Sequence, residues 1–131
     1  MRVPHYVKWK EGFEKVLLEE YQLLKERAQI VMEDMALFCQ SAGVEFIVTD
    51  IVSNPDEDKR LGRVSKSHSE FRAFDFRIWH WSKEFLAKFE QVFEHRYKHW
   101  AALSKETLQP NLIVYHDNGH GNHGHCQIKP Y

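Results

Sequence analysis

One apolar stripe at helical spacing runs through the first third of the chain, and it constrains the fold more than any other feature. Its members advance by threes and fours, as positions on one face of an α-helix do. They are Phe13, Leu17, Tyr21, Leu24, Ala28, Val31, Met35 and Phe38. Charged residues fill much of the remaining surface. The stripe therefore predicts one long amphipathic helix over about residues 11–42, followed by Gly43 at the position where glycine commonly ends a helix.

The rest of the chain alternates between strand-like and helical segments. Strands are predicted for "VEFIVTDIV" (44–52), "FRAFDFRI" (71–78), "NLIVYH" (111–116) and "HGHCQIK" (123–129), because β-branched and aromatic residues are frequent in most of them. Ser82 is a suitable N-cap for a second helix over residues 83–103. The order helix, strand, strand, helix, strand, strand predicts an α+β fold, with helices packed on a small antiparallel sheet.

Length and charge limit the classes of function. A chain of 131 residues fits one domain, residues 1–131, with a single core. The formal net charge is −1, which gives no broad attraction to nucleic acid or to an anionic membrane. No apolar run approaches the roughly 20 residues that span a bilayer. The N-terminus lacks the apolar core of a signal peptide. We therefore expect a monomer made in the cytoplasm, with no nucleic-acid partner and no membrane insertion.

The two cysteines, Cys39 and Cys126, are too few for a disulfide framework and are expected to be buried thiols. Histidine is the compositional outlier, with nine residues. Four of them fall within the ten residues 116–125. Clusters of this kind indicate metal binding or proton transfer.

Strand alternation predicts which polar side chains share a face. In the 71–78 strand, Asp75 and Arg77 lie opposite the phenylalanines. In the last strand, His123 and His125 lie opposite Cys126. If these two strands pair, both polar sets converge. His68 lies just before the first of them and can bend back toward Asp75.

Two imidazoles and one carboxylate form a suitable ligand set for a catalytic zinc ion, which usually takes three protein ligands and leaves one position for water. We therefore expect His68, Asp75 and His125 to be the zinc ligands. Water bound to zinc ionises near neutral pH. His123 would lie just outside the ligand set, where it can move a proton or stabilise an oxyanion.

The stretch "SKSHSEFRAFD", followed much later by "HGHCQI", resembles the M15 group of zinc peptidases, which includes D-alanyl-D-alanine carboxypeptidases and phage endolysins. That group shares one metal-binding fold with lysostaphin-type enzymes and the hedgehog signalling domain. Ser65 or Ser67 precedes His68, Ala73 precedes Asp75, and His125 follows, as in the family signature. The resemblance covers most of the chain from about residue 30 onward.

This resemblance implies hydrolysis of an amide bond in peptidoglycan stem or cross-link peptides, with release to the cell wall by a phage or as part of a virion. An arginine often holds a substrate carboxylate in such enzymes. Arg63, Arg72 and Arg77 are the candidates, and strand parity favours Arg77. A solvated or salt-bridged arginine is the alternative for each.

Three features depart from the family pattern. Asn122 stands where many members have an acidic general base, so His123, Asp117 or His120 would have to replace it, and the resemblance to related H-x-H enzymes favours His123. Phe71 stands where glycine is usual. The substrate-binding stretch is replaced by "TDIVSNPDEDKR".

Two alternatives to a peptidase remain open. One is a non-catalytic structural or interaction protein that keeps the metal site, which Asn122 favours. The other is a domain that only mediates contacts, with the histidines 116, 120 and 123 in a solvated loop. "WHW" at 79–81 is expected to pack in the core or at the helix start rather than line a groove. His95 and His99, one helical turn apart, are expected to be surface residues rather than ligands.

Overall fold

The computed structural model describes residues 1–51, 70–103, 108–117 and 122–130. Its elements are β1 (Val7–Trp9), α1 (Glu14–Tyr21), α2 (Glu26–Ser41), β2 (Phe46–Asp50), β3 (Ala73–Arg77), α4 (Lys83–Arg96), β4 (Ile113–Asp117) and β5 (Asn122–Gln127). The strands form one sheet in the order β1-β2-β3-β5-β4. β1 pairs with β2 in parallel, and all the other pairs are antiparallel. The predicted α+β class is confirmed, although the sheet is mixed rather than purely antiparallel.

The single helix predicted over residues 11–42 is wrong, because the chain forms two helices there. α1 ends at Tyr21, and Lys25 adopts an extended conformation before α2 begins. The backbone N–H of Lys25 donates to the carbonyl of Phe71 at 2.8 Å, which ties the break to the start of β3. Tyr21 and Leu24 are both buried, so the apolar stripe stays on the core across the break, although Phe13 at its start is 48% exposed.

The predicted end of the first helical segment and the predicted start of the second helix agree with the structure, but the predicted end of the second helix does not. Gly43 has a φ of +70° just after α2, a backbone conformation that glycine adopts without strain. The Ser82 side chain accepts from the N–H of Phe85 at 3.1 Å, as an N-cap does. α4 ends at Arg96 rather than near residue 103. Ala101 instead forms a backbone bridge with Ile128, beyond the end of β5.

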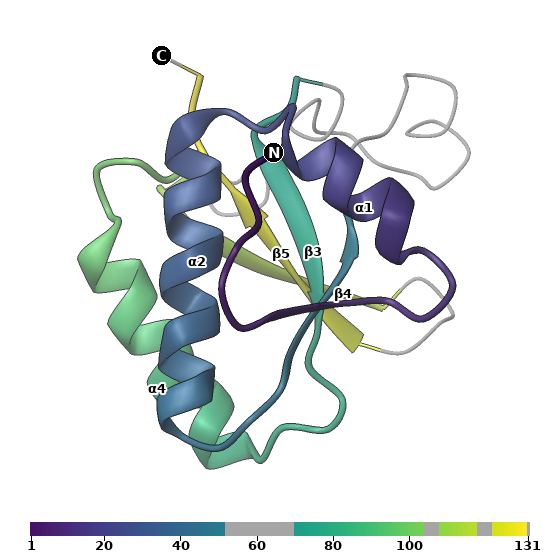
Figure 1. Ribbon diagram of the computed structural model, residues 1–131. Helices are drawn as coiled ribbons and strands as arrows, with labels where there is room; N and C mark the ends of the chain where they lie inside the picture. Colours follow the sequence, from purple (N-terminus) through teal and green to yellow (C-terminus); the bar gives the residue numbers. More distant parts are fainter. Residues whose placement is uncertain (52–69, 104–107, 118–121, 131) are drawn as a thin grey trace.

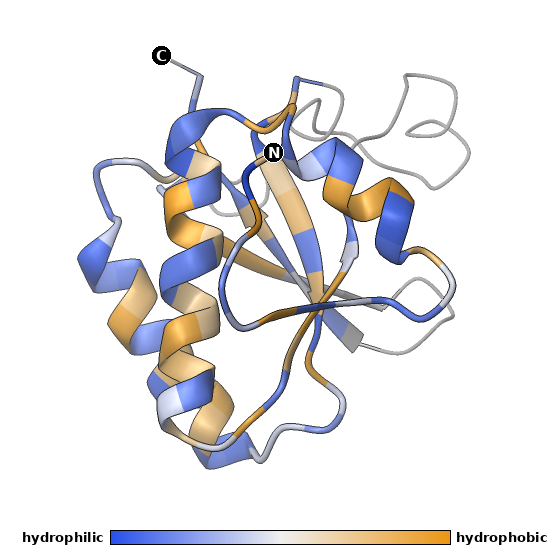
Figure 2. Cartoon of the chain, in the orientation of Figure 1, coloured by the Kyte–Doolittle hydropathy of each residue, from blue (hydrophilic) through white to orange (hydrophobic). Residues whose placement is uncertain are grey.

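Helices α2 and α4 pack side by side on one face of the sheet (Figure 1). Phe38 of α2 contacts three rings of α4, those of Phe85, Phe89 and Phe93, with centroids 5.4–5.8 Å apart. Hydrophobic and hydrophilic residues alternate along β3 (Figure 2). Phe74 and Phe76 supply its apolar side and are fully buried. The helices therefore cover the phenylalanine face and leave the opposite face of β3 for Asp75 and Arg77.

β3 and β5 pair as the sequence suggested, and the pairing depends on Gly124. Phe76 and Gly124 are direct partners across the two strands. A Cβ atom on Gly124 would lie 2.4 Å from Cζ of Phe76, closer than real Cβ atoms come to other atoms. The Phe76 ring therefore lies over the glycine in the core. The apolar parity of Cys126 and Ile128 is confirmed as well, since both are buried in the same core.

Candidate metal centre

Asp75 and His125 meet on the sheet face opposite the helices. They are direct partners in the β3–β5 register. Oδ1 of Asp75 lies 2.8 Å from Nδ1 of His125, within hydrogen-bond distance. The two residues are only 4% and 5% exposed. Two residues 50 positions apart in the sequence are thus brought into direct contact, as strand parity predicted.

Burial of this pair away from water has a free-energy cost. A carboxylate removed from water is costly unless a charge or a hydrogen-bond donor compensates it. The imidazole of His125 supplies such a partner, either as an N–H donor or, with a cation between the two groups, as a second ligand. The contact compensates the buried carboxylate, and a carboxylate oxygen and an imidazole nitrogen are also atoms that bind divalent cations.

The spacing of the donor atoms is close to that of two zinc ligands. In a tetrahedral site with zinc–ligand distances of about 2.0–2.1 Å, two donor atoms lie about 3.3–3.4 Å apart. Oδ1 and Nδ1 would have to separate by only about 0.5 Å from their 2.8 Å distance to share an ion. The chemistry and placement of Asp75 and His125 therefore fit a zinc site.

The third predicted ligand, His68, lies outside the described residues, as does Arg63. Within the described ranges, no group of three or more histidine, cysteine, aspartate or glutamate side chains is arranged to hold a metal ion. The structure thus brings together two of the three predicted ligands and does not place the third.

Asp50 lies next to this pair, and sequence reasoning missed it. It is the Cα partner of Asp75 across β2 and β3, just after an irregularity that follows Val48. Val48 and Ile51 are both buried in the core, although residues three apart on a regular strand face opposite sides. An extra residue in β2 reverses the parity and places half-buried Asp50 on the face of Asp75. Simple alternation from Val48 would have assigned Asp50 to the core.

His123 and Arg77 occupy the next row of the same face. They are direct partners in the register, two residues along from Asp75 and His125, and both are half-buried. The guanidinium carbon of Arg77 lies 5.0 Å from the centroid of the Trp79 ring. Trp79 is 65% exposed. A cation, an imidazole and an exposed aromatic ring therefore lie beside the Asp–His pair.

Arg72 lies elsewhere. Its Nη1 donates to the carbonyl of Ile128 at 2.6 Å, and its Nε donates to Glu70 at 2.9 Å. It shares the strand parity of Phe74, and it lines a separate cavity whose lining residues include neither Asp75 nor His125. Of the two candidate arginines within the described residues, Arg77 lies on the face of the Asp–His pair and Arg72 does not.

The other singled-out residues divide between core and surface. Trp81 packs in the core, as expected, and its Nε1 donates to the carbonyl of Glu45. Trp79 does not, since it is mostly exposed. His95 and His99 are exposed, as expected of a helix surface and the turn after it. Asn122 starts β5 and Asp117 ends β4, but their side chains lie outside the described part, as does His120.

Both cysteines are free and buried, which confirms their prediction as thiols. Burial raises the pKa of Cys39 to about 12 and raises that of Cys126 well above its ordinary value. Both thiols therefore stay protonated, and so weakly nucleophilic, at neutral pH.

In the described part of the chain, none of the helices has the length and apolar character needed to span a bilayer. Comparisons with protein-family models, with curated proteins and with solved structures found no match.

Proposed function

We propose that this protein is a zinc-dependent metallopeptidase that hydrolyses an amide bond in peptidoglycan stem or cross-link peptides. The observation that carries the proposal is the buried contact between Asp75 and His125 on adjacent strands, on the face away from the core. The resemblance of the motifs around His68 and His125 to M15 peptidases supplies the substrate class. We also propose that the chain adopts the fold of that group.

The backbone at Phe71 supports the resemblance. The family usually has glycine at this position, and Phe71 has a φ of 61°, in the left-handed region that glycine occupies most easily. The hydrogen bond from Lys25 to its carbonyl helps to hold this conformation. The departure from the family pattern at Phe71 therefore changes the side chain and adds backbone strain.

Asp75 and His125 would hold the ion, and His68 would complete the ligand set. Zinc bound there would polarise the scissile carbonyl and lower the pKa of a bound water molecule. His123 lies one row away on the same face, and its imidazole would accept the proton from that water and return it to the leaving amine. This role replaces the acidic base that is missing at Asn122.

Arg77 would orient the substrate. Its guanidinium group stacks near the Trp79 ring, which restricts its direction while leaving N–H donors for a carboxylate. Peptidoglycan peptides end in carboxylates, so a fixed two-pronged donor beside the ligand pair suits them.

A metal-binding protein without catalysis is the second candidate. The asparagine at position 122 favours it, because a neutral amide cannot accept the proton of the attacking water. The two candidates share the zinc site and differ only in turnover.

Digestion of purified cell walls separates the two candidates. Zinc-loaded protein is expected to release peptides with new amine termini, identified by mass spectrometry. His123→Ala should lower kcat by about 10²–10⁴-fold while zinc stays bound. Arg77→Lys keeps the positive charge but loses the paired N–H donors of the guanidinium group, so it should chiefly raise KM.

His95→Ala is the matched control, because His95 is an exposed histidine of α4 and lies outside the site. Its activity should equal that of the unaltered protein. Absence of new amine termini across about pH 5–9, with zinc bound, would reject the peptidase and leave the second candidate.

A further inference from the structure

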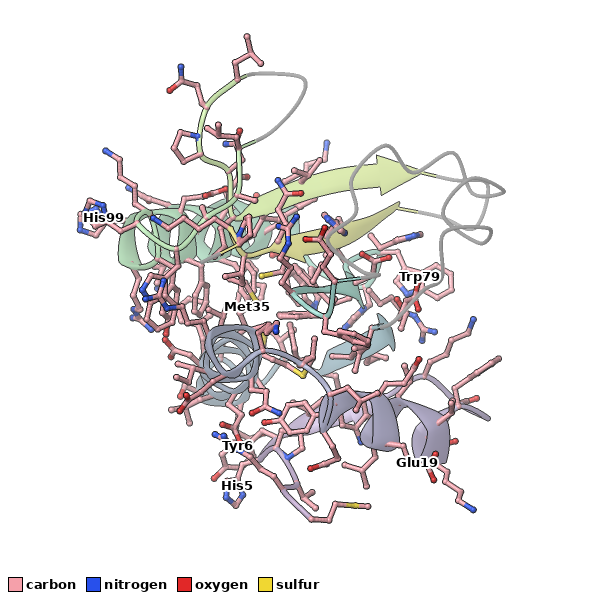
Figure 3. All side chains as sticks on the ribbon, turned by 90° about the horizontal axis from the view of Figure 1, so that it is seen from above. His5, Tyr6, Glu19, Met35, Trp79 and His99 are labelled. Carbon is pink, nitrogen blue, oxygen red and sulfur yellow. The ribbon has the colours of Figure 1, made fainter. Side chains whose placement is uncertain are left out.

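A cavity lies at the other end of β3 and β5 from Arg77 and His123. Its volume is about 690 Å³, which is within the usual range for small-molecule sites. Its lining comes from the start of β3, the segment after α4, Pro110 and the end of β5. The residues are Glu70, Arg72, Lys98, His99, Ala101, Ala102, Leu103, Pro110, Lys129 and Pro130. Figure 3 shows His99 and Trp79 on opposite sides of the molecule.

The walls of this cavity are fixed by backbone hydrogen bonds. The N–H of Lys129 donates to Trp100, and that of Ala102 donates to Gln127. Leu103 forms a bridge with Pro110. Because these bonds join three separate segments, the cavity is formed before any ligand enters. A preformed cavity spares a ligand the cost of ordering its walls.

The cavity carries excess positive charge although the whole chain has a net charge of −1. Among the lining residues that the structure describes, Arg72, Lys98 and Lys129 are cationic, and Glu70 is the one carboxylate. Leaving His99 out of the count, three positive charges and one negative charge give an excess of two. A phosphate monoester carries about −1.5 to −2 near pH 7, which matches this excess better than a single carboxylate does.

Arg72 is oriented for such a ligand. Its side chain is only 12% exposed, and Ile128 and Glu70 hold Nη1 and Nε. Nη2 has no hydrogen-bond partner among the described residues. A guanidinium group fixed on two sides loses little entropy when it binds phosphate.

The strained backbone at Phe71, whose φ is 61°, immediately precedes Arg72. Strain in a bulky residue persists only where the surrounding structure holds it, and it often occurs at binding sites. Apolar side chains complete the lining, including Ala101, Ala102 and Pro130. They would contact an organic body attached to the phosphate.

From these observations we infer that the cavity around Arg72 is a binding site for a small organic phosphate monoester, separate from the Asp75–His125 centre. The phosphate would lie among Arg72, Lys98 and Lys129, and the organic group would lie against the alanine and proline wall. This site does not depend on zinc or on peptidase activity.

The test is a titration of isotope-labelled protein with phenyl phosphate, followed by amide chemical shifts. Saturable shifts are expected at Arg72, Ala102 and Lys129. Inorganic phosphate should bind more weakly because it lacks the organic group, and neutral benzyl alcohol should give no shifts there. Benzoate, with a single negative charge, should also bind more weakly. Equal binding of benzyl alcohol or inorganic phosphate, or no saturable shift up to about 10 mM phenyl phosphate, would overturn the inference.

Variants of the lysines test which positive charges bind the phosphate. The double variant Lys98→Gln, Lys129→Gln should raise the Kd for phenyl phosphate at least about tenfold. Both lysines are exposed, so these substitutions leave the fold intact, whereas Arg72→Gln would also remove the bond to Ile128. Lys88→Gln, an exposed lysine of α4 outside the cavity, is the matched control and should bind normally. Equal loss in the control would refute the assignment.

His125→Ala separates this site from the proposed zinc centre. It should bind phenyl phosphate with an unchanged Kd whether or not it retains zinc. Loss of phosphate binding in a folded His125→Ala variant would show that the two sites are one.

Discussion

Gly124→Ala tests how closely β5, the strand that carries His123 and His125, packs against the core. The added Cβ would lie 2.4–2.9 Å from three atoms of the Phe76 ring. That ring cannot move away easily, because it is fully buried and its centroid lies 5.3–5.8 Å from those of Phe46, Trp81 and Phe89. Forcing an extra carbon into a packed core costs about 1–3 kcal/mol. We expect the free energy of unfolding to fall by about 2 kcal/mol.

Urea denaturation followed by circular dichroism measures this loss. A companion variant, Phe76→Leu, provides space, so the double variant should be more stable than the sum of the two single losses predicts. The expected coupling is about 0.5–3 kcal/mol, the range found for residues in contact. A loss below about 0.5 kcal/mol for Gly124→Ala, or strictly additive losses, would refute the argument from close packing.

Three further predictions concern the packing of the helices and the sheet. The carboxylate of Glu94 accepts hydrogen bonds from the N–H groups of residues 112 and 113, and burial raises its pKa. Its contribution to the free energy of unfolding is therefore greatest below its ordinary pKa of 4.5 and falls as the pH rises through the raised pKa. Urea midpoints measured against pH should therefore fall more steeply for the unaltered protein than for Glu94→Gln, and parallel profiles would contradict this. The hydroxyl of Tyr97 forms a hydrogen bond with Asp34 that joins the end of α4 to α2. Tyr97→Phe removes it and should lower the free energy of unfolding by about 1 kcal/mol in the same assay. An unchanged urea midpoint would show that this hydrogen bond does not stabilise the fold. Cys39 and Cys126 should react with an aromatic disulfide reagent only in denaturant, and rapid labelling of either in the native protein would disprove their burial.

Much of the sheet could be predicted from alternation. The partners Phe74 and Cys126 share the buried face, and Asp75 and His125 share the other, as period-two patterning requires. The Ser82 cap and the glycine after α2 follow from local backbone and hydrogen-bonding preferences. These features depend on short-range geometry that the sequence encodes directly.

Other features depend on contacts that alternation does not encode. The break between α1 and α2 carries no proline or glycine and is tied by the hydrogen bond from Lys25 to Phe71, 46 positions away. β1 has only three residues and depends on its parallel pairing with β2. Asp50 reaches the site because β2 contains an extra residue, which reverses the parity expected from Val48.

The arginine candidates show the same division. Arg77 lies on the face of the Asp–His pair, where parity placed it. Arg72 follows the opposite parity and is bound to Glu70 and Ile128, so it belongs to the separate basic cavity. Strand parity therefore predicted which of these two arginines lies beside the Asp–His pair.

Zinc stoichiometry tests the account most directly. Protein freed of metal, loaded with zinc and dialysed should retain about one zinc ion per chain by elemental analysis. His68→Ala and His125→Ala, shown to be folded by circular dichroism, should retain none, while His95→Ala should retain the full amount. Zinc bound equally by His125→Ala, or no zinc bound by the unaltered protein, would contradict the account.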